Sequence, residues 1–351
     1  MHQIYSQISG WGKYVPDNVV TNFDLEKMVD TSHDWVVQRT GIEERRIATK
    51  NETTGTMAVA ASQKALSVAG LTAADLDLII VATSSPDYFV PAVSSTVQAA
   101  LGANCPAFTV MTGCTGFVYA LVTGHQFIAT GAFKRVLVVG VELISRFIDW
   151  NDRNTCVLFG DGAGAVVLTP SLTPRGVLGF DLGSNGELGH NLILEGGGCA
   201  NPFSQEVLDT GKHYLQMNGR EVFKFATRIL PQSTAKVLQH ANLNLNDIDM
   251  LIPHQANARI IELAIKYLGI DPAKVFVNVN KYGNTSAASI PIALVEALEQ
   301  GRIKADDKVA LVSFGAGLTW ASAVVQWGVA APSLNGRETN AAILQEETAV
   351  V

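Results

Sequence analysis

Runs of apolar residues alternate with helix-like patterns along this chain. Residues 78–82 and 136–140 are continuous apolar runs, the pattern of strands that are covered on both faces. Residues 57–69 and 116–130 carry the apolar spacing of helices that pack against a sheet. The alternation of buried strands with helices predicts an α/β protein built in layers.

The pattern of the first half recurs in the second half. Residues 64–80 and residues 236–252 both contain the end of a helix, a short loop and an apolar strand, at a constant separation of 172. Residues 131–134 match residues 301–304 at a separation of 170. Chance similarity between α/β segments is the alternative explanation. Because the spacing holds through helix, loop and strand, we predict two copies of one unit, related by a pseudo-twofold axis, with a site between them.

The repeat relates three polar positions to one another. At a separation of 170, Cys114 falls on Asn284, so both are expected in strand-to-helix turns. At a separation of 172, His254 falls on Ala82, at the carboxyl end of a buried strand, where ligands collect in open α/β sheets. A cysteine between glycines at a helix start fits a nucleophile, because the helix dipole favours the thiolate. The alternatives are an inert buried cysteine, a hydrogen-bonded core histidine and an ordinary asparagine turn.

Composition narrows the possible functions. The chain has 351 residues, of which 48% are hydrophobic and 16% charged, enough for one large domain or two fused ones. The net charge of −7 provides no global basic field for nucleic acid. The four cysteines are far apart, so neither a disulfide framework nor a zinc site is expected. Without a signal peptide or an apolar run of ~18 residues, we expect a cytoplasmic protein with no membrane association.

Several motifs together resemble one enzyme family. They are Cys114, HQAN at 254–257, GNTSAAS at 283–289 and GAG at 315–317, and in this order they are similar to the β-ketoacyl-acyl carrier protein synthase III family. Further similar segments are DTSHDWVVQRTGIEERRIA (30–48), FGDGAGAVVL (159–168) and MNGREVFKFA (217–226). The resemblance extends from residue 3 to residue 328. It implies a thiolase fold: two pseudo-twofold-related βαβαβαββ halves in a five-layered αβαβα arrangement.

The same resemblance implies an activity and roles for individual residues. The reaction would be a decarboxylative Claisen condensation of an acyl-CoA starter with malonyl-acyl carrier protein, in a homodimer with no bound cofactor. Cys114 would carry the acyl group, His254 and Asn284 would bind the malonyl thioester carbonyl, and Phe314 would assist decarboxylation. The backbone N–H groups of Cys114 and Ala316 would hold the oxyanion. The positions that match the CoA site are Thr31, Trp35, Arg39 and Arg153, and those that match a basic patch for the carrier protein are Lys224, Arg259 and Lys266.

The chain departs from the family pattern in three places. The residues before the cysteine read MTG, where many relatives have alanines, and the last glycine turn reads GAG instead of GGG. Val90 matches a position that limits the acyl pocket across the dimer interface and is often phenylalanine. The smaller valine predicts a pocket for starters longer or more branched than acetyl.

The predicted organisation is an N-terminal half at 1–172, a C-terminal half at 173–328 and an extension at 329–351. The extension has a polar start typical of a mobile segment, and an added helix at 340–347 is the alternative.

Other enzyme classes fit the sequence less well. A degradative thiolase needs a second cysteine in the last glycine turn, and residues 314–321 contain none. A hydroxymethylglutaryl-CoA synthase needs a glutamate upstream of the cysteine, and the nearest acid, Asp87, has different surroundings. A non-catalytic partner subunit would lack Cys114. The GxGxG in residues 160–164 lacks the following helix of a nucleotide site. The remaining alternatives are a synthase III-like ketosynthase of specialised metabolism and an acyltransferase that uses another acceptor.

Overall fold

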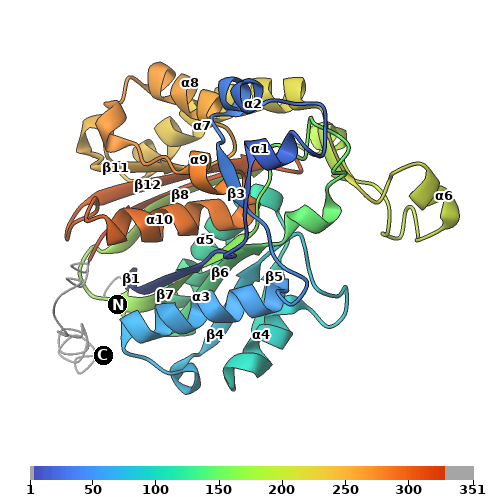
Figure 1. Cartoon of the computed structure of the whole chain (residues 1–351). Coiled ribbons are helices and arrows are strands. Elements are labelled where there is room, and N and C mark those ends of the chain that lie inside the picture. Colours follow the sequence, from blue (N-terminus) through green and yellow to red (C-terminus); the bar gives the residue numbers. More distant parts are fainter. Residues whose placement is uncertain (1–3, 329–351) are drawn as a thin grey trace.

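The structure contains two main sheets, and the two predicted buried strands, residues 78–82 and 136–140, are neighbours in the first of them (Figure 1). The computed structural model describes residues 4–328. In the first sheet the strand order is β1-β7-β6-β4-β5, formed by Tyr5–Tyr14, Gly162–Ser171, Val136–Glu142, Leu78–Ala82 and Ala107–Val110. In the second sheet the order is β11-β12-β13-β8, formed by Met250–Pro253, Lys308–Gly315, Thr319–Gln326 and Gly176–Ser184.

Helices cover both sheets and fill the space between them. The outer face of the first sheet carries α3 (Thr54–Ala69) and α4 (Val93–Leu101), and that of the second carries α7 (Gly219–His240) and α8 (Ala258–Leu268). Helices α5 (Gly116–Ala129) and α10 (Ser289–Glu299) lie between the sheets and contact both. Five layers in the order αβαβα result, as the family resemblance implied.

The internal repeat is confirmed by the order of the elements. β4 runs parallel to β6, and β11 runs parallel to β12. The short helices η1 (Ala73–Asp75) and η5 (Leu245–Asp247) precede β4 and β11, and each begins with a capping box closed by its aspartate. The two copies differ at one edge of the sheet. In the first copy β5 pairs with β4, whereas at the equivalent edge of β11 in the second copy Val275 forms only an isolated bridge to Leu251.

The remaining elements are short and connect or cover the layers. They are β2 (Val19–Thr21), α1 (Asn22–Leu25), α2 (His33–Thr40), β3 (Glu44–Arg46), η2 (Gly113–Thr115), η3 (Ile144–Phe147), η4 (Gly186–Asn191), β9 (Leu192–Leu194), α6 (Gln205–Asp209), β10 (Leu215–Met217), η6 (Pro272–Lys274), α9 (Val279–Tyr282) and η7 (Ser286–Ala288). The segment with α6 projects from the body of the molecule (Figure 1).

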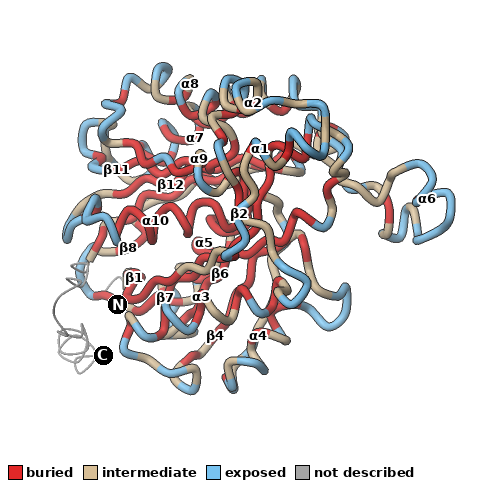
Figure 2. The backbone as a smooth tube through the Cα atoms, viewed as in Figure 1, coloured by how far each residue is buried: buried red, intermediate tan, exposed pale blue. Residues whose placement is uncertain are grey.

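Sequence composition explains which helices lie at the centre. Every residue of α10 from Ser289 to Leu298 is buried, whereas α3 and α8 each present one buried and one exposed face (Figure 2). A helix that is apolar on all sides must be covered on all sides, so α10 lies inside the molecule. The helix predicted at 57–69 begins earlier, at Thr54, because Thr53 and Thr56 form a capping box.

The proposed division at residue 172 lies between β7 and β8, and it stays a prediction. The extension 329–351 and its alternative helix lie outside the described residues. Among residues 4–328, no helix is both long and apolar enough to cross a bilayer.

The two halves come into close contact at Gly140 of β6. A Cβ added to Gly140 would lie 2.4 Å from the carbonyl oxygen of Ala287 in η7. A Gly140→Ala substitution should therefore lower the free energy of unfolding by about 1–3 kcal/mol, the usual cost of overpacking. Gly186→Ala is the matched control, because its added Cβ meets nothing within 4 Å, and it should change stability by less than about 0.5 kcal/mol. Urea unfolding of both variants measures the difference, and equal stabilities would contradict this contact.

Candidate active site

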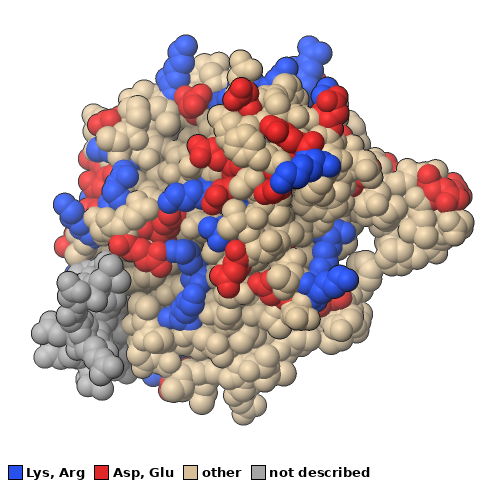
Figure 3. Space-filling model, in the orientation of Figure 1, with Lys and Arg blue, Asp and Glu red and all other residues tan. Residues whose placement is uncertain are grey.

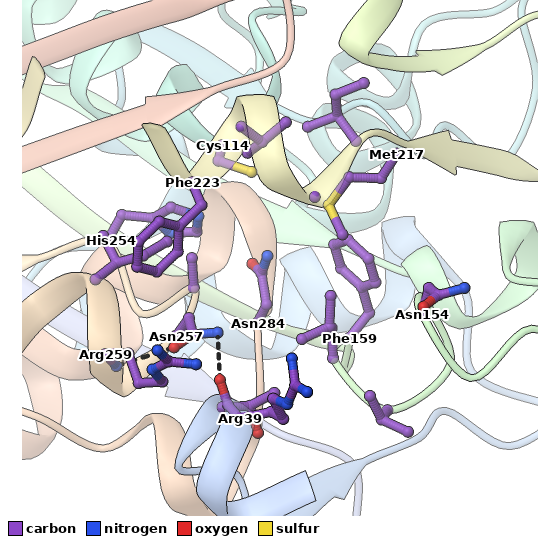
Figure 4. A pocket seen from close by; sticks show the side chains of 18 of the residues that line it. Arg39, Cys114, Asn154, Phe159, Met217, Phe223, His254, Asn257, Arg259 and Asn284 are labelled. Atoms are coloured by element: carbon purple, nitrogen blue, oxygen red, sulfur yellow. Dashed lines mark hydrogen bonds between the residues drawn. The ribbon is translucent and has the colours of Figure 1, made fainter. Parts of the chain in front are cut away.

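Cys114, His254 and Asn284 line one cavity of about 270 Å³. Figure 4 shows their side chains around a common space, with Phe159, Met217 and Phe223 on its walls. Cys114 comes from the turn η2, ahead of α5, while the other two come from the second half of the chain. The structure thus brings together the three residues that the repeat had related to one another.

Cys114 is held in place by contacts between two glycine turns. The preceding Gly113 has φ of 58°, and a Cβ on it would lie 2.9 Å from the backbone nitrogen of Ala316. A Cβ on Gly315 would lie 2.7 Å from the backbone nitrogen of Cys114. In addition, the Ser313 hydroxyl donates to the Cys114 carbonyl at 2.8 Å. The backbone nitrogens of Cys114 and Ala316 therefore lie in two turns that are in van der Waals contact.

The thiol of Cys114 is poorly solvated. Burial raises its pKa to about 12, while the interaction with the Ser286 side chain acts in the opposite direction. The thiol is therefore predominantly protonated at neutral pH in the absence of substrate, and reaction with a thioester requires a group that removes its proton.

His254 is a neutral hydrogen-bond donor. Its Nδ1 lies 2.6 Å from the Ser289 hydroxyl, which also accepts a weak bond from the backbone N–H of Gln255 at 3.4 Å. Because that hydroxyl can donate its proton to Nδ1, we assign the tautomer in which Nδ1 accepts and Nε2 carries the ring proton. Burial lowers the pKa of His254 to about 3, which keeps the ring uncharged. Nε2 is buried and has no protein partner among the described residues.

Asn284 presents its amide NH₂ to the cavity. Its Oδ1 accepts the backbone N–H of Ser286 at 2.9 Å, which fixes the orientation of the amide group. Its backbone is held by Leu158 and Gly160, through bonds of 2.8 and 3.0 Å. A Cβ on Gly283, at φ of 63°, would lie 2.8 Å from the Leu158 carbonyl oxygen. The FGDGAG segment thus supports Asn284, which explains a motif whose nucleotide interpretation was weak.

Phe314 packs beside the histidine. The two rings meet edge to face, with centroids 5.4 Å apart and an interplanar angle of 65°. Phe314 is buried and lines the cavity, so it keeps the space next to His254 apolar.

A tryptophan ring lies at the opening of the cavity, and the guanidinium groups of two arginines lie near it. The guanidinium carbons of Arg39 and Arg153 lie 5.5 and 5.2 Å from the ring centroid of Trp35, and all three residues line the cavity. Arg153 also donates to the backbone oxygen of Asp30 at 3.0 Å. Thr31 does not line the cavity, and its hydroxyl is buried without a hydrogen-bond partner among the described residues.

The structure brings only one of the predicted carrier-protein residues to the cavity. Arg259 lines it, with its guanidinium carbon 5.9 Å from the ring centroid of Phe223. Lys224 pairs with Glu221 on the exposed face of α7, at 2.7 Å, and Lys266 is exposed on α8. Val90 is 87% exposed, and within a single chain it does not reach the cavity.

Sequence reasoning missed the polar groups behind the site. Ser286 and Ser289 belong to the GNTSAAS motif but were given no role, although they contact Cys114 and His254. Glu142 was also missed: it is a completely buried acid at the carboxyl end of β6. An acidic residue that ends an apolar strand is the same signal that identified His254, so Glu142 was visible in the sequence. No cluster of metal-ligating side chains occurs in residues 4–328.

The neutral state of His254 leads to a spectroscopic prediction. NMR of ¹⁵N-histidine-labelled protein should show His254 as the Nε2–H tautomer throughout pH 5–8, because its pKa is lowered to about 3. Ser289→Ala removes the donor to Nδ1 and should allow both tautomers. The resonance is assigned by its loss in His254→Ala. A titration of His254 with a midpoint near the ordinary value of 6.5 would contradict the buried neutral ring.

Comparisons with known proteins identify the family of this chain. Residues 108–186 match the family model "3-Oxoacyl-[acyl-carrier-protein (ACP)] synthase III", and residues 238–327 match the model of its C-terminal part. The chain is 51% identical, over 93% of its length and 98% of the relative, to a β-ketoacyl-[acyl-carrier-protein] synthase III from Caldanaerobacter subterraneus. The solved synthase III from Thermus thermophilus is 45% identical with a TM-score of 0.86, covering 92% of this chain and 99% of that one. The priming β-ketosynthase of the R1128 polyketide pathway is 32% identical with a TM-score of 0.87, covering 94% and 98%. The chain belongs to the β-ketoacyl-[acyl-carrier-protein] synthase III family.

Proposed function

We propose that this chain condenses an acyl-CoA starter with malonyl-acyl carrier protein, with loss of CO₂, to give the β-ketoacyl-acyl carrier protein that begins fatty acid synthesis. The observation that carries the proposal is the convergence of one thiol, Cys114, with two neutral donors, His254 and Asn284, in a single cavity. A thiol can carry an acyl group, and two neutral donors can stabilise an enolate, so both half-reactions of a ping-pong condensation have their groups in one place.

In the first half-reaction, the Cys114 sulfur attacks the carbonyl carbon of acyl-CoA. Negative charge develops on the carbonyl oxygen, and the backbone N–H groups of Cys114 and Ala316 stabilise it. Their two turns are in contact, which supports a shared oxyanion site. The tetrahedral intermediate then expels the CoA thiolate, which takes a proton from solvent, and an acyl-Cys114 thioester remains.

In the second half-reaction, malonyl-acyl carrier protein occupies the vacated space. The Nε2–H of His254 and the amide NH₂ of Asn284 donate to its thioester oxygen. Loss of CO₂ leaves an enolate whose charge these donors stabilise, and neither side chain has to change its own charge. The apolar ring of Phe314 beside the carboxylate favours the departure of neutral CO₂. The enolate carbon attacks acyl-Cys114, and the β-ketoacyl product leaves with the sulfur released as a thiolate.

Substrate recognition is assigned to the mouth of the cavity. Trp35 with Arg39 and Arg153 offers a planar ring and two cations to the adenine and phosphates of CoA. Thr31 is proposed to belong to the same site through the family motif. Figure 3 shows basic side chains projecting at the end of the molecule where Figure 1 places α2 and α8, with acidic side chains among them. We propose that Arg259, Lys224 and Lys266 meet the acidic carrier protein here, in a cytoplasmic homodimer.

The covalent intermediate gives the direct test of this function. Incubation with acyl-CoA should add one acyl mass to Cys114, and malonyl-acyl carrier protein should then remove it as the β-ketoacyl product. Intact-protein and peptide mass spectrometry follow both steps. An adduct that is transferred to another acceptor without condensation would indicate an acyltransferase, and the absence of any adduct would contradict the proposal.

The division of labour predicts how variants separate the two steps. Cys114→Ala should abolish acyl transfer but retain malonyl decarboxylation, because His254 and Asn284 carry that step. Adding His254→Ala to this background should slow decarboxylation by about 10²–10³-fold, the usual cost of one oxyanion donor. Loss of decarboxylation in a folded Cys114→Ala protein would count against the assignment.

Val90 leads to a prediction about the starter. If it bounds the acyl pocket of a partner subunit, the small side chain should allow isobutyryl- and octanoyl-CoA to react at rates comparable to that of acetyl-CoA. Val90→Phe should shift the preference toward acetyl by tenfold or more, as a rough expectation for one or two excluded methylene groups. Initial rates with the three starters decide, and a strong acetyl preference in the unaltered protein would refute the idea.

A further inference from the structure

Glu142 is an acid buried at the centre of the molecule without a basic partner. Its exposed fraction is 0%, and it ends β6 beside the cavity turns. Ser84 donates its backbone N–H to both carboxylate oxygens, each at 3.1 Å, while the hydroxyls of Thr83 and Ser85 donate to Oε2 at 3.3 and 2.5 Å. Among the residues described, no Lys, Arg or His forms an ion pair with it. A buried carboxyl group without a counter-ion is costly and is typical of functional sites.

Ser286 connects this acid to the nucleophile. Its hydroxyl donates to Oε1 of Glu142 at 3.1 Å. Ser286 belongs to η7, which packs against the turn η2 that carries Cys114, and its side chain interacts with the thiol and lowers the thiol's pKa. Ser286 adopts φ of 49°, a left-handed conformation that costs free energy in a residue other than glycine. The bond from its backbone N–H to Asn284 and that from its hydroxyl to Glu142 hold it there. The strain is therefore located at the residue that lies between the acid and the thiol.

We propose that Glu142 accepts the proton of the Cys114 thiol through the hydroxyl of Ser286, so that Glu142 acts as a positioning residue for formation of the nucleophile. The inference deepens the proposed function and rests on it.

The transfer balances over one catalytic cycle. The S–H bond of Cys114 breaks as its proton moves to the Ser286 oxygen, and the Ser286 proton moves to Oε1 of Glu142. The sulfur electron pair forms the S–C bond with the acyl carbon. When condensation releases Cys114 as a thiolate, Glu142 returns the proton by the same path. The CoA thiolate is protonated by solvent, which matches the one proton that the overall reaction consumes.

Histidine is the obvious competitor for this proton, and its hydrogen bonds argue against it. The Ser289 hydroxyl occupies Nδ1 of His254, so Nε2 already carries a hydrogen. With a pKa lowered to about 3, the ring is also a weak base. Burial instead raises the pKa of Glu142 to about 7, near the value that suits a general base at neutral pH.

The groups that face Glu142 are otherwise uncharged. Loop residues 83–85 and η7 contribute hydroxyl and amide donors, and Gly162 is its neighbour on β7. The titratable group that interacts with it electrostatically is the thiol of Cys114 on η2. The pH dependence of thiol reactivity should therefore report on this pair.

Alkylation of Cys114 by iodoacetamide tests the relay without any substrate. Glu142→Gln should slow alkylation about 10²-fold at pH 7, because the amide cannot accept the proton. The unaltered protein should reach a plateau in rate as pH rises past about 7, and the variant should lack this plateau. If Glu142 acted only as a repelling negative charge, the same substitution would speed alkylation. Peptide mass spectrometry separates Cys114 from the exposed Cys199, whose rate is the internal reference.

Further variants separate the relay from a structural role. Ser286→Ala should slow alkylation as much as Glu142→Gln, and the double variant should be no slower than either alone. Glu142→Asp should recover part of the rate. Thr83→Val removes one bond to Glu142 outside the relay and should stay within about twofold of the unaltered protein. In a Cys114→Ala background, Glu142→Gln should leave malonyl decarboxylation unchanged, which shows that the site remains folded.

Alkylation of Glu142→Gln at or above the normal rate, or additive effects of the two relay variants, would overturn the proposal. Failure of acyl-CoA to label Cys114 in the unaltered protein would instead overturn the proposed function, so the two failures are distinguishable.

Discussion

The burial of α5 and α10 between two sheets is the constraint on which the site depends. Both helices are apolar on nearly every side, and both contact the two sheets that enclose them. Their N-terminal turns, η2 and η7, consequently lie against each other and against the ends of β6 and β12. The nucleophile of one half and the donors of the other therefore line the same cavity.

That arrangement also determines the charge states in the site. Polar groups that are buried at strand ends must be hydrogen-bonded, and here serine and threonine hydroxyls satisfy most of them. Ser289 fixes the tautomer of His254, Ser286 fixes the orientation of Asn284 and contacts the thiol, and burial keeps the histidine neutral. Donors prepared in this way need little reorganisation when charge develops on a substrate oxygen.

Sequence patterns predicted much of this architecture, because their signals were local and periodic. The apolar runs located β4 and β6, and the repeat placed Cys114 and Asn284 in equivalent turns. The support of Asn284 by residues 158–160 was not predictable in this way, since it depends on a backbone bridge between distant segments. The partners of Glu142 were missed for the same reason: they come from a loop near residue 84 and from η7. The proposed role of Val90 depends on a second copy of the chain, which sequence periodicity does not describe.

The central proposal is that acyl transfer and decarboxylation use different groups within one cavity. Its most direct test is single-turnover acylation of Cys114 in His254→Ala and Asn284→Ala, followed by mass spectrometry before and after addition of malonyl-acyl carrier protein. Both variants should acquire the acyl group at close to the normal rate and then retain it, because the enolate is not stabilised. Loss of acylation in either folded variant, or normal turnover of the acyl-enzyme, would contradict it.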